Sequence, residues 1–191
     1  MTHERRFNPE LAHRLISPER EARWQPRQFL EKLGLNTGQQ VVDLGCGPGF
    51  WTFPLAEVVG PTGTVWAVDI SPEMLQLLRE RGLPEHVRPV LAALPDVPLP
   101  EKCVDWVWTA FTFHEVEPFP AFAALLARLV RPAGHVIVLE WRPDAASEQG
   151  PPRHHRLAPE QIQSWLIEAG LTHVHLVWQD EDTYLITARG R

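Results

Sequence analysis

The chain has 191 residues, of which 44% are hydrophobic, and it carries a formal charge of −6 at pH 7. This length is typical of one large domain that buries a substantial core, so a single domain is expected over residues 1–191. The negative charge argues against tight, sequence-independent binding to nucleic acid, which depends on Lys and Arg neutralising phosphates, and no nucleic-acid partner is expected.

Apolar segments of strand length alternate with amphipathic segments, which is the pattern of a βαβ sheet. Strands are predicted at residues 41–44, 64–68, 87–91, 104–109, 135–141, 173–178 and 183–188. Helices are predicted at residues 50–59, 72–81, 119–130 and 160–169. Because a four-residue polar segment joins the last two strands, they are expected to form an antiparallel hairpin.

Two segments fall outside this alternation. Residues 1–36 are predicted to form a helical cap packed on the sheet, with one helix starting at Ser17-Pro18 and another near Pro26. Residues 143–157 form a long loop after the fifth predicted strand, with Gly150-Pro151-Pro152 at its middle. Loops anchored on a rigid sheet are where binding residues concentrate, so this loop is expected on the substrate side.

The strongest motif is a glycine-rich turn after the first predicted strand. Val41–Leu44 leads into Gly45-Cys46-Gly47-Pro48-Gly49, and a helix follows. Glycine lets a ligand approach the backbone closely and adopts φ angles that other residues avoid. Because ligands of open α/β sheets bind at the carboxyl ends of strands, the turn predicts a ligand site.

This turn departs from the dinucleotide-binding fingerprint G-x-G-x-x-G, whose third glycine allows a helix to pack closely on a strand. Counted from Gly45, that third position is Phe50. Asp43 lies two residues before the first glycine, where a carboxylate would repel a pyrophosphate and attract an α-ammonium group. The turn therefore favours a zwitterionic amino-acid ligand over a phosphate.

Asp69 ends the second predicted strand. A carboxylate accepts two hydrogen bonds, so Asp69 can hold both hydroxyls of a ribose. The alternative is a solvated Asp that caps the helix for which Ser71 is the predicted N-cap. The position of Asp69 after the glycine turn favours the ribose role.

Five segments, in this order and at these spacings, resemble class I S-adenosylmethionine-dependent methyltransferases, most closely the ubiquinone/menaquinone-biosynthesis-like branch. They are Val42–Gly49, Trp66–Met74, Val104–Val107, Phe113–Glu115 and Leu129–Val136. The resemblance implies S-adenosylmethionine as the cofactor. It also implies a Rossmann-like α/β fold, with a seven-stranded, mostly parallel sheet, an antiparallel last strand and helices on both faces.

The resemblance further implies roles for individual residues. Asp43 and the turn with Gly45, Gly47 and Gly49 would receive the methionine part of the cofactor. Asp69 would bind the ribose.

Three more positions would complete the cofactor site. Ile70 would pack on the adenine, Leu94 would contact it through apolar or backbone atoms, and Thr109 would lie beside the methionine part. Many relatives also carry an Asp after the third strand that contacts the adenine amino group. Residues 91–94 are Leu-Ala-Ala-Leu here, so that contact is not expected.

Methyl transfer from a sulfonium has a good leaving group, so the enzyme mainly has to place the nucleophile in a dry pocket. A base is needed only where the acceptor must lose a proton early. His114 is the candidate catalytic base, and a structural histidine bonded to a neighbouring loop is the alternative. We expect an acceptor pocket bounded by Trp24, His114, Trp141 and His154, with Glu140 helping to form its wall. The alternative to this pocket role is packing in the core for the tryptophans and exposure on a solvated loop for His154.

Several acceptors are disfavoured. The Asn/Asp-Pro-Pro-Tyr/Phe motif of amino-group methyltransferases and the Pro-Cys nucleophile of cytosine chemistry are both absent from the sequence. A small organic acceptor, methylated at O, N or C, remains. The alternatives are a module that binds S-adenosylmethionine without transferring methyl, and a nicotinamide-dependent oxidoreductase, which Phe50 and Asp43 argue against.

The remaining expectations concern metals, membranes and location. Cys46 and Cys103 form no CxxC pair, so no metal site is expected. No stretch approaches the ~20 apolar residues that span a bilayer, so no membrane partner is expected. Residues 1–6 lead into no apolar segment of a signal peptide, which makes the cytoplasm the expected location. The sequence predicts no particular oligomeric state.

Overall fold

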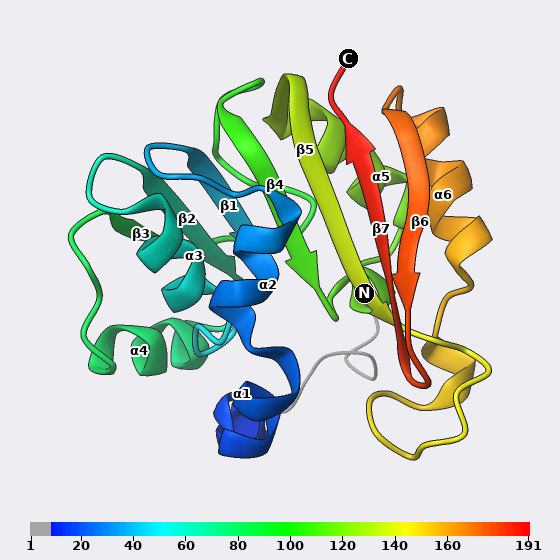
Figure 1. Cartoon of the computed structure of the whole chain (residues 1–191), viewed down its shortest axis with the longest axis horizontal. Helices are drawn as coiled ribbons and strands as arrows, with labels where there is room; N and C mark the ends of the chain where they lie inside the picture. The colour runs from blue at the N-terminus through cyan, green and yellow to red at the C-terminus, as the bar shows by residue number, and fades with distance from the viewer. Residues whose placement is uncertain (1–8) are drawn as a thin grey trace. The chain divides into compact units, whose positions relative to one another are not determined.

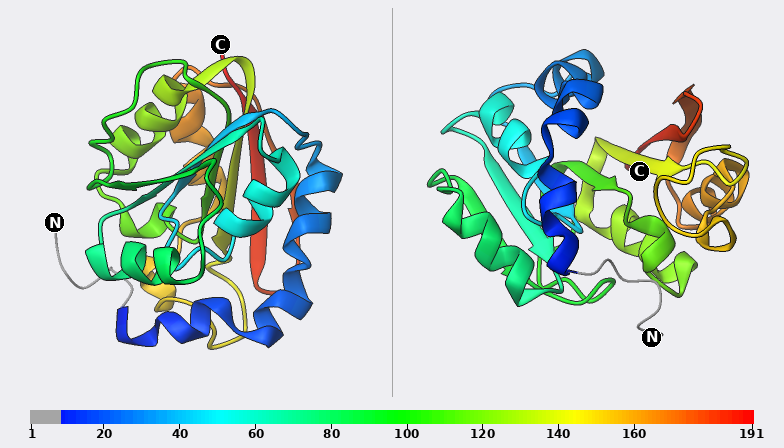
Figure 2. Two further views of the ribbon diagram at one scale, coloured as in Figure 1. Left: turned by 90° about the vertical axis from the view of Figure 1, so that its left-hand side faces the viewer. Right: turned by 90° about the horizontal axis from the view of Figure 1, so that it is seen from below.

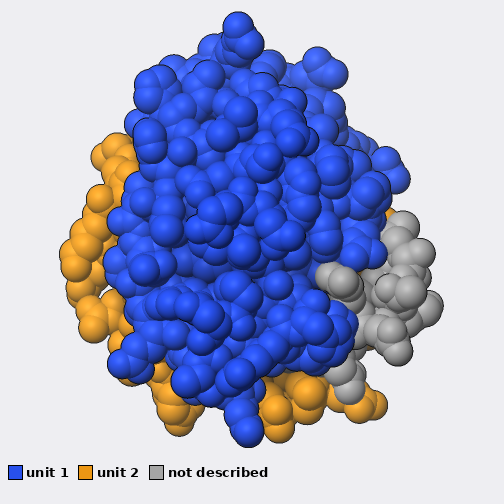
Figure 3. All heavy atoms as spheres, turned by 90° about the vertical axis from the view of Figure 1, so that its right-hand side faces the viewer, with its two compact units in different colours: residues 1–6, 94–191 blue, residues 7–93 orange. Residues whose placement is uncertain are grey.

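The computed structural model of the chain describes residues 9–191 (Figure 1). It contains a seven-stranded sheet with strand order β3-β2-β1-β4-β5-β7-β6. This confirms the predicted Rossmann-like α/β class. The chain divides into two compact units, and the described residues belong to residues 7–93 and 94–191 (Figure 3). The single domain expected over residues 1–191 stays a prediction.

The unit of residues 7–93 contains three helices of the predicted N-terminal cap, followed by three strands that alternate with two helices. In chain order these are the 3-10 helix η2 (Pro9–Ile16), α1 (Pro18–Trp24), α2 (Pro26–Leu33), β1 (Gln40–Leu44), α3 (Thr52–Val59), β2 (Thr64–Asp69), α4 (Pro72–Glu80) and β3 (Val87–Leu91).

Local capping explains where the helices of this unit begin. Ser17 accepts a hydrogen bond from the backbone of Arg20, and Pro18 occupies the first turn of α1. Ser71 caps α4 in the same way, with Pro72 after it, as the sequence predicts. The left-handed backbone of Gln25 separates α1 from α2. Both predicted N-terminal helix starts are confirmed.

Strands β1, β2 and β3 pair in parallel, with Val42 opposite Trp66 and Asp69 opposite Leu91. Helix α3 packs on β1 and β2, and α4 packs on β2 and β3. Because the strands are parallel, their carboxyl ends lie at one edge of the sheet. The glycine turn that follows β1 and Asp69 at the end of β2 are therefore neighbours.

The unit of residues 94–191 contains four strands and two α-helices. Its elements are β4 (Val104–Ala110), the 3-10 helix η3 (Phe113–Glu115), α5 (Phe119–Leu129), β5 (Val130–Trp141), the 3-10 helix η4 (Arg153–His155), α6 (Pro159–Glu168), β6 (Thr172–Gln179) and β7 (Thr183–Arg189). Helices α5 and α6 pack against each other, α5 on β4 and β5 and α6 on β6 and β7 (Figures 1 and 2).

Strand β7 lies antiparallel to both of its neighbours, β5 and β6, which confirms the predicted hairpin and the antiparallel last strand. Strand β5 begins at Val130, five residues before the predicted start at His135. Its register against β4 shifts after Val130, and Ala133 has a φ of 61°. Pro132-Ala133-Gly134 thus forms an irregularity within a longer strand. Among the described residues, no helix has the length and apolar character needed to cross a bilayer.

Candidate active site

The glycine turn has a backbone that other residues would adopt only with strain. The φ angles of Gly45, Gly47 and Gly49 are 74°, 52° and 91°, all in the left-handed region. The amides of Gly45 and Cys46 both donate to the carbonyl of Val68, at 2.9 and 3.0 Å. These bonds anchor the start of the turn to β2.

Gly47 and Gly49 are required for different reasons. A Cβ at Gly47 would meet only Leu15 Cδ1, at an ordinary contact distance of 3.5 Å. A Cβ at Gly49 would lie 2.3 Å from Leu78 Cδ1 and 2.9 Å from Phe53 Cε2. Gly49 therefore serves the packing of α4 and α3 against the turn, whereas at Gly47 it is the left-handed backbone angle that favours glycine.

Asp69 connects the turn to the start of α4. Its Oδ2 accepts a hydrogen bond from the amide of Gly47 at 2.8 Å, and its Oδ1 accepts one from the amide of Ser71 at 2.9 Å. Burial raises the pKa of Asp69, and these two hydrogen bonds oppose the rise. A carboxylate has about four acceptor positions, so Asp69 can bond a ribose while it keeps both amides. The two roles weighed for Asp69 are compatible.

Asp43, in β1, is 2% exposed. Its Oδ2 accepts a hydrogen bond of 2.7 Å from Thr52 Oγ1. The pKa of Asp43 is raised to about 7, mainly by burial. The charge of Asp69 adds to the rise, and the hydrogen bond from Thr52 opposes it. A buried carboxylate that is bonded by a neutral hydroxyl is stabilised when a cation comes beside it. Asp43 therefore suits an ammonium group.

Ile70 follows Asp69 directly and leaves 37% of its surface exposed. An exposed branched apolar side chain beside the Asp69 carboxylate suits contact with a planar base. Taken together, the turn and these side chains fit S-adenosylmethionine. Asp43 would take its ammonium group, Asp69 its ribose and Ile70 its adenine, as the sequence resemblance implies.

Leu94 and Thr109, the other two predicted cofactor residues, belong to the unit of residues 94–191. Leu94 is 9% exposed, and Thr109 is fully buried in β4. The Thr109 hydroxyl has no hydrogen-bond partner within the described chain, and a buried polar group of this kind is costly unless a ligand satisfies it. The cofactor contacts of Leu94 and Thr109 stay predictions.

His114 forms a buried pair with Glu140. His114 is 3% exposed on η3, and Glu140 is 1% exposed at the end of β5. The imidazole Nδ1 lies 3.0 Å from Glu140 Oε1 and 2.9 Å from Oε2. Oε1 also accepts from the His114 amide at 3.2 Å, and Oε2 accepts from the Trp141 amide at 3.0 Å. From the sequence, Glu140 was expected only in the wall of the acceptor pocket. Its position at the carboxyl end of a strand parallel to β4 was the feature that could have predicted a contact with His114.

Trp141 holds part of the 143–157 loop. A Cβ on Gly150 would come within 2.6 Å of the Trp141 ring, and Arg156 lies over that ring at 5.9 Å. The ring of Phe111 packs against the Trp141 ring at a centroid separation of 4.8 Å. His154 is exposed on the same loop, with its ring 4.3 Å from that of His155.

Trp24 is 7% exposed and packs with Phe29 and Trp51, each at a ring separation of 5.8 Å. It belongs to the unit of residues 7–93, whereas His114, Trp141 and His154 belong to the other unit. The acceptor pocket expected between these four side chains stays a prediction.

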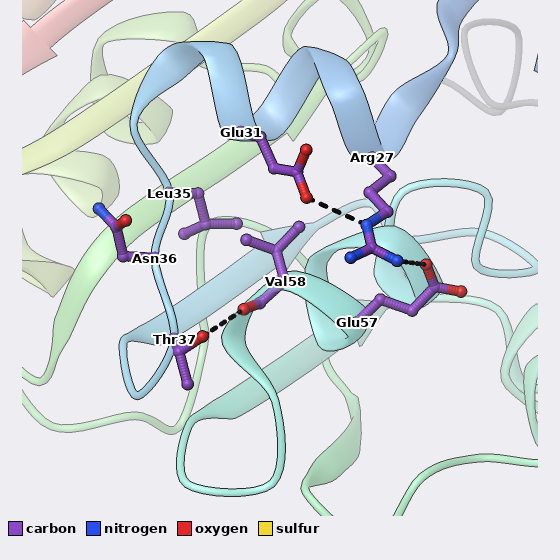
Figure 4. A pocket seen from close by; sticks show the side chains of 7 residues that line it. All are labelled: Arg27, Glu31, Leu35, Asn36, Thr37, Glu57 and Val58. Atoms are coloured by element: carbon purple, nitrogen blue, oxygen red, sulfur yellow. Dashed lines mark hydrogen bonds and ion pairs between the residues drawn. The ribbon is translucent and has the colours of Figure 1, made fainter.

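A surface depression lies between α2 and α3 (Figure 4). Arg27 crosses it, 3.0 Å from Glu31 and 3.9 Å from Glu57, with all three side chains substantially exposed. Such exposed ion pairs contribute little to stability. None of the predicted site residues lines this depression.

Comparison with known proteins identifies methyltransferases as relatives of this chain. Residues 41–134 match a family described as a methyltransferase domain. Demethylmenaquinone methyltransferase from Geobacillus sp. (strain WCH70) is 31% identical over 130 residues, which cover 66% of this chain and 55% of that protein. The chain thus spans about half the length of the curated relatives it matches.

Solved structures share the fold along nearly the whole chain. The crystal structure of a SAM-dependent methyltransferase from Aquifex aeolicus has 29% identity and a TM-score of 0.87, covering 96% of this chain and 98% of that one. The [4+2]-cyclase SpnF shares the fold at 18% identity and a TM-score of 0.75, covering 91% of this chain and 82% of that one. By its sequence and fold, the chain belongs to the class I S-adenosylmethionine-dependent methyltransferases, on the branch that includes the demethylmenaquinone methyltransferases.

Proposed function

We propose that the protein transfers the methyl group of S-adenosylmethionine to a small organic acceptor, at an oxygen, nitrogen or carbon atom. The observation that carries the proposal is the cluster of Asp43, the glycine turn and Asp69 at the carboxyl ends of β1 and β2, in a chain with methyltransferase relatives. When bound, the cofactor supplies an electrophilic methyl group on a sulfonium.

The chain's own residues supply binding and orientation. Asp43 would hold the ammonium group, Asp69 the ribose and Ile70 the adenine, so that the cofactor has one orientation on the sheet edge. Positioning of this kind accounts for much of the barrier reduction in such displacements. His114, Trp141 and His154, with Trp24, are the proposed contacts of the acceptor.

A quinone-like aromatic acceptor is the first to test, because the curated relatives are named for demethylmenaquinone. We expect radioactive methyl from labelled S-adenosylmethionine to appear in one member of a panel of phenols, quinols, amines and organic acids. Retention of all label in the donor across the panel, in a protein that binds the donor, would favour the alternative below. A cytoplasmic location and the lack of a nucleic-acid partner stay predictions from the sequence.

The alternative is a domain that binds S-adenosylmethionine without transferring its methyl group. A solved structure that shares this fold is described as a [4+2]-cyclase, so the fold by itself does not determine the reaction.

Binding of the cofactor is expected to stabilise the protein. Ligand at ~100 times its dissociation constant adds about 2.7 kcal/mol to the free energy of unfolding. We expect S-adenosylmethionine and its demethylated product to raise the melting temperature and NAD to leave it unchanged. A shift with NAD alone would assign the site to an oxidoreductase.

Asp69→Ala is expected to weaken the binding of S-adenosylmethionine by about 10- to 150-fold, since hydrogen bonds to a charged group are worth ~1.5–3 kcal/mol. Isothermal calorimetry measures the affinity, and circular dichroism checks the fold. The control is Glu73→Ala. Glu73 lies close by and its side chain accepts a hydrogen bond from the Ser71 hydroxyl, so this change should leave the affinity intact. Equal affinities of the Asp69→Ala and wild-type proteins would contradict the ribose role.

A further inference from the structure

The pair of His114 and Glu140 has an arrangement that fixes where each proton lies. Both oxygens of Glu140 accept backbone hydrogen bonds, one from the His114 amide and one from the Trp141 amide. Two N–H donors stabilise the ionised carboxylate, which can only accept hydrogen bonds. The proton between Glu140 and the imidazole therefore belongs to Nδ1 of His114.

This assignment determines the chemistry of the other ring nitrogen. A neutral histidine protonated at Nδ1 has its lone pair on Nε2, which is then the atom that accepts a proton. Once Nε2 is protonated, the imidazolium lies between two carboxylates. Glu140 is at 2.9 Å from Nδ1, and Glu115 Oε1 is at 3.8 Å from Nε2.

We propose that Glu140 is a positioning residue that holds His114 in the Nδ1–H tautomer, so that Nε2 of His114 takes the proton of the methyl acceptor. This rests on the proposed function. In the step, the acceptor's O–H, N–H or C–H bond breaks and its electron pair stays on the acceptor atom, where it is available for methylation. The proton forms the Nε2–H bond of His114, and the Glu140 carboxylate stabilises the resulting charge.

In the described part of the chain, the charged and titratable groups around the pair include side chains on η3, β5 and β7. Glu115 lies on η3 with His114, and Glu140 lies on β5. Tyr184, on β7, is opposite Glu140 in the sheet and donates from its hydroxyl to the Leu157 carbonyl at 2.8 Å. Burial raises the pKa of Tyr184 far above its ordinary value, so this residue stays neutral and adds no charge.

The tautomer can be observed without cofactor or acceptor. In the full chain labelled with ¹⁵N-histidine, long-range ¹H–¹⁵N correlations at alkaline pH are expected to show His114 protonated at Nδ1. His86 is the internal control: its Nε2 lies 2.9 Å from the Ala56 carbonyl, an acceptor only, so His86 should show the opposite tautomer. In Glu140→Gln the Nδ1–H preference of His114 should be lost. An Nε2–H tautomer in the wild type, or an unchanged preference in Glu140→Gln, would overturn the positioning role.

His114→Asn separates catalysis from structure. Asparagine can place a side-chain N–H near the position of Nδ1, which keeps a donor toward Glu140, but it has no atom at Nε2. With the acceptor that the labelled-methyl panel identifies, we expect a melting temperature and a cofactor affinity near those of the wild type and a kcat lowered by about 10²- to 10⁴-fold. His114→Gln, which lacks a donor near Nδ1, should lose both kcat and stability.

The pH profile completes the test. In the wild type, kcat should fall at acidic pH as Nε2 becomes protonated, and Glu140→Gln should move this fall to lower pH because the charge that stabilises the imidazolium is gone. Glu140→Asp should restore part of the wild-type profile. An undiminished kcat in a folded His114→Asn protein would show that the pair only connects η3 to β5. Loss of methyl transfer by every variant and by the wild type would instead refute the proposed function, while the tautomer measurement still decides the role of Glu140.

Discussion

Gly49→Ala is expected to lower the free energy of unfolding by about 2–5 kcal/mol. A Cβ at this position would lie 2.3 Å from Leu78 Cδ1 and 2.9 Å from Phe53 Cε2, both in a well-packed part of the unit. Overpacking costs typically 1–3 kcal/mol, and a left-handed backbone adds roughly 1–2 kcal/mol for a residue other than glycine. Urea unfolding followed by circular dichroism measures the difference.

Gly47→Ala is the matched control, two residues away in the same turn. Its φ of 52° predicts a cost of roughly 1–2 kcal/mol, but its Cβ would meet only Leu15 at 3.5 Å, without overlap. We expect Gly47→Ala to fold and to bind S-adenosylmethionine more weakly, because the added carbon lies on the turn that is predicted to receive the methionine part of the cofactor. Equal losses of stability at the two glycines would show that the left-handed backbone causes the loss and that the contacts of a Cβ at Gly49 add nothing to it.

Asp43→Asn is expected to raise the free energy of unfolding above pH 7 by about 3–5 kcal/mol and to remove a pH dependence that the wild type should show. In the folded protein burial raises the pKa of Asp43 to about 7, from an ordinary value of 3.8. Between these values the folded state keeps a proton that the unfolded chain releases, so wild-type stability falls as pH rises from about 4 to 7. Unfolding of both proteins at pH 5 and pH 8 measures the effect.

Two further measurements connect Asp43 to the ligand. Thr52→Val removes the hydroxyl that donates to Asp43 at 2.7 Å, so the pKa should rise further and the loss of stability should extend to higher pH. In the wild type, an ammonium group favours ionised Asp43. Below pH 7 the affinity for S-adenosylmethionine should therefore rise by up to about tenfold for each unit by which the pH is raised. Asp43→Asn should bind weakly at every pH. A wild-type stability that is flat between pH 5 and pH 8 would contradict the raised pKa.

The strands and helices follow from patterns that act over a few residues. The predicted strand at residues 87–91 matches β3 at both ends, and the starts at Ser17-Pro18 and Ser71-Pro72 are confirmed because an N-cap hydroxyl and a following proline are satisfied within one turn. The start of β5 was wrong by five residues. There the chain stays in the sheet through pairing of Val130 with Val104, a partner distant in sequence.

The predicted site also has features that local sequence patterns indicate and features that depend on residues distant in the sequence. Some of the predicted site residues stand out in the sequence because a strand, a tight turn and a helix leave few residue types that satisfy the backbone. They are Asp43, Gly45, Gly47, Gly49 and Asp69. Sequence spacing could not show that Thr52 bonds Asp43, that Gly49 is needed for Leu78, or that Glu140 bonds His114.

The sequence by itself therefore determined the family, the order of the elements and the edge of the sheet where Asp43, the glycine turn and Asp69 gather, since these depend on local backbone chemistry and hydrophobic periodicity. Only the tertiary structure decided which side chains are paired. Glu140 and His114 are 26 residues apart, and they meet because the end of β5 lies beside the segment that follows β4. The protonation of a buried carboxylate or imidazole depends on the burial and the donors that such long-range contacts create, which no local pattern encodes.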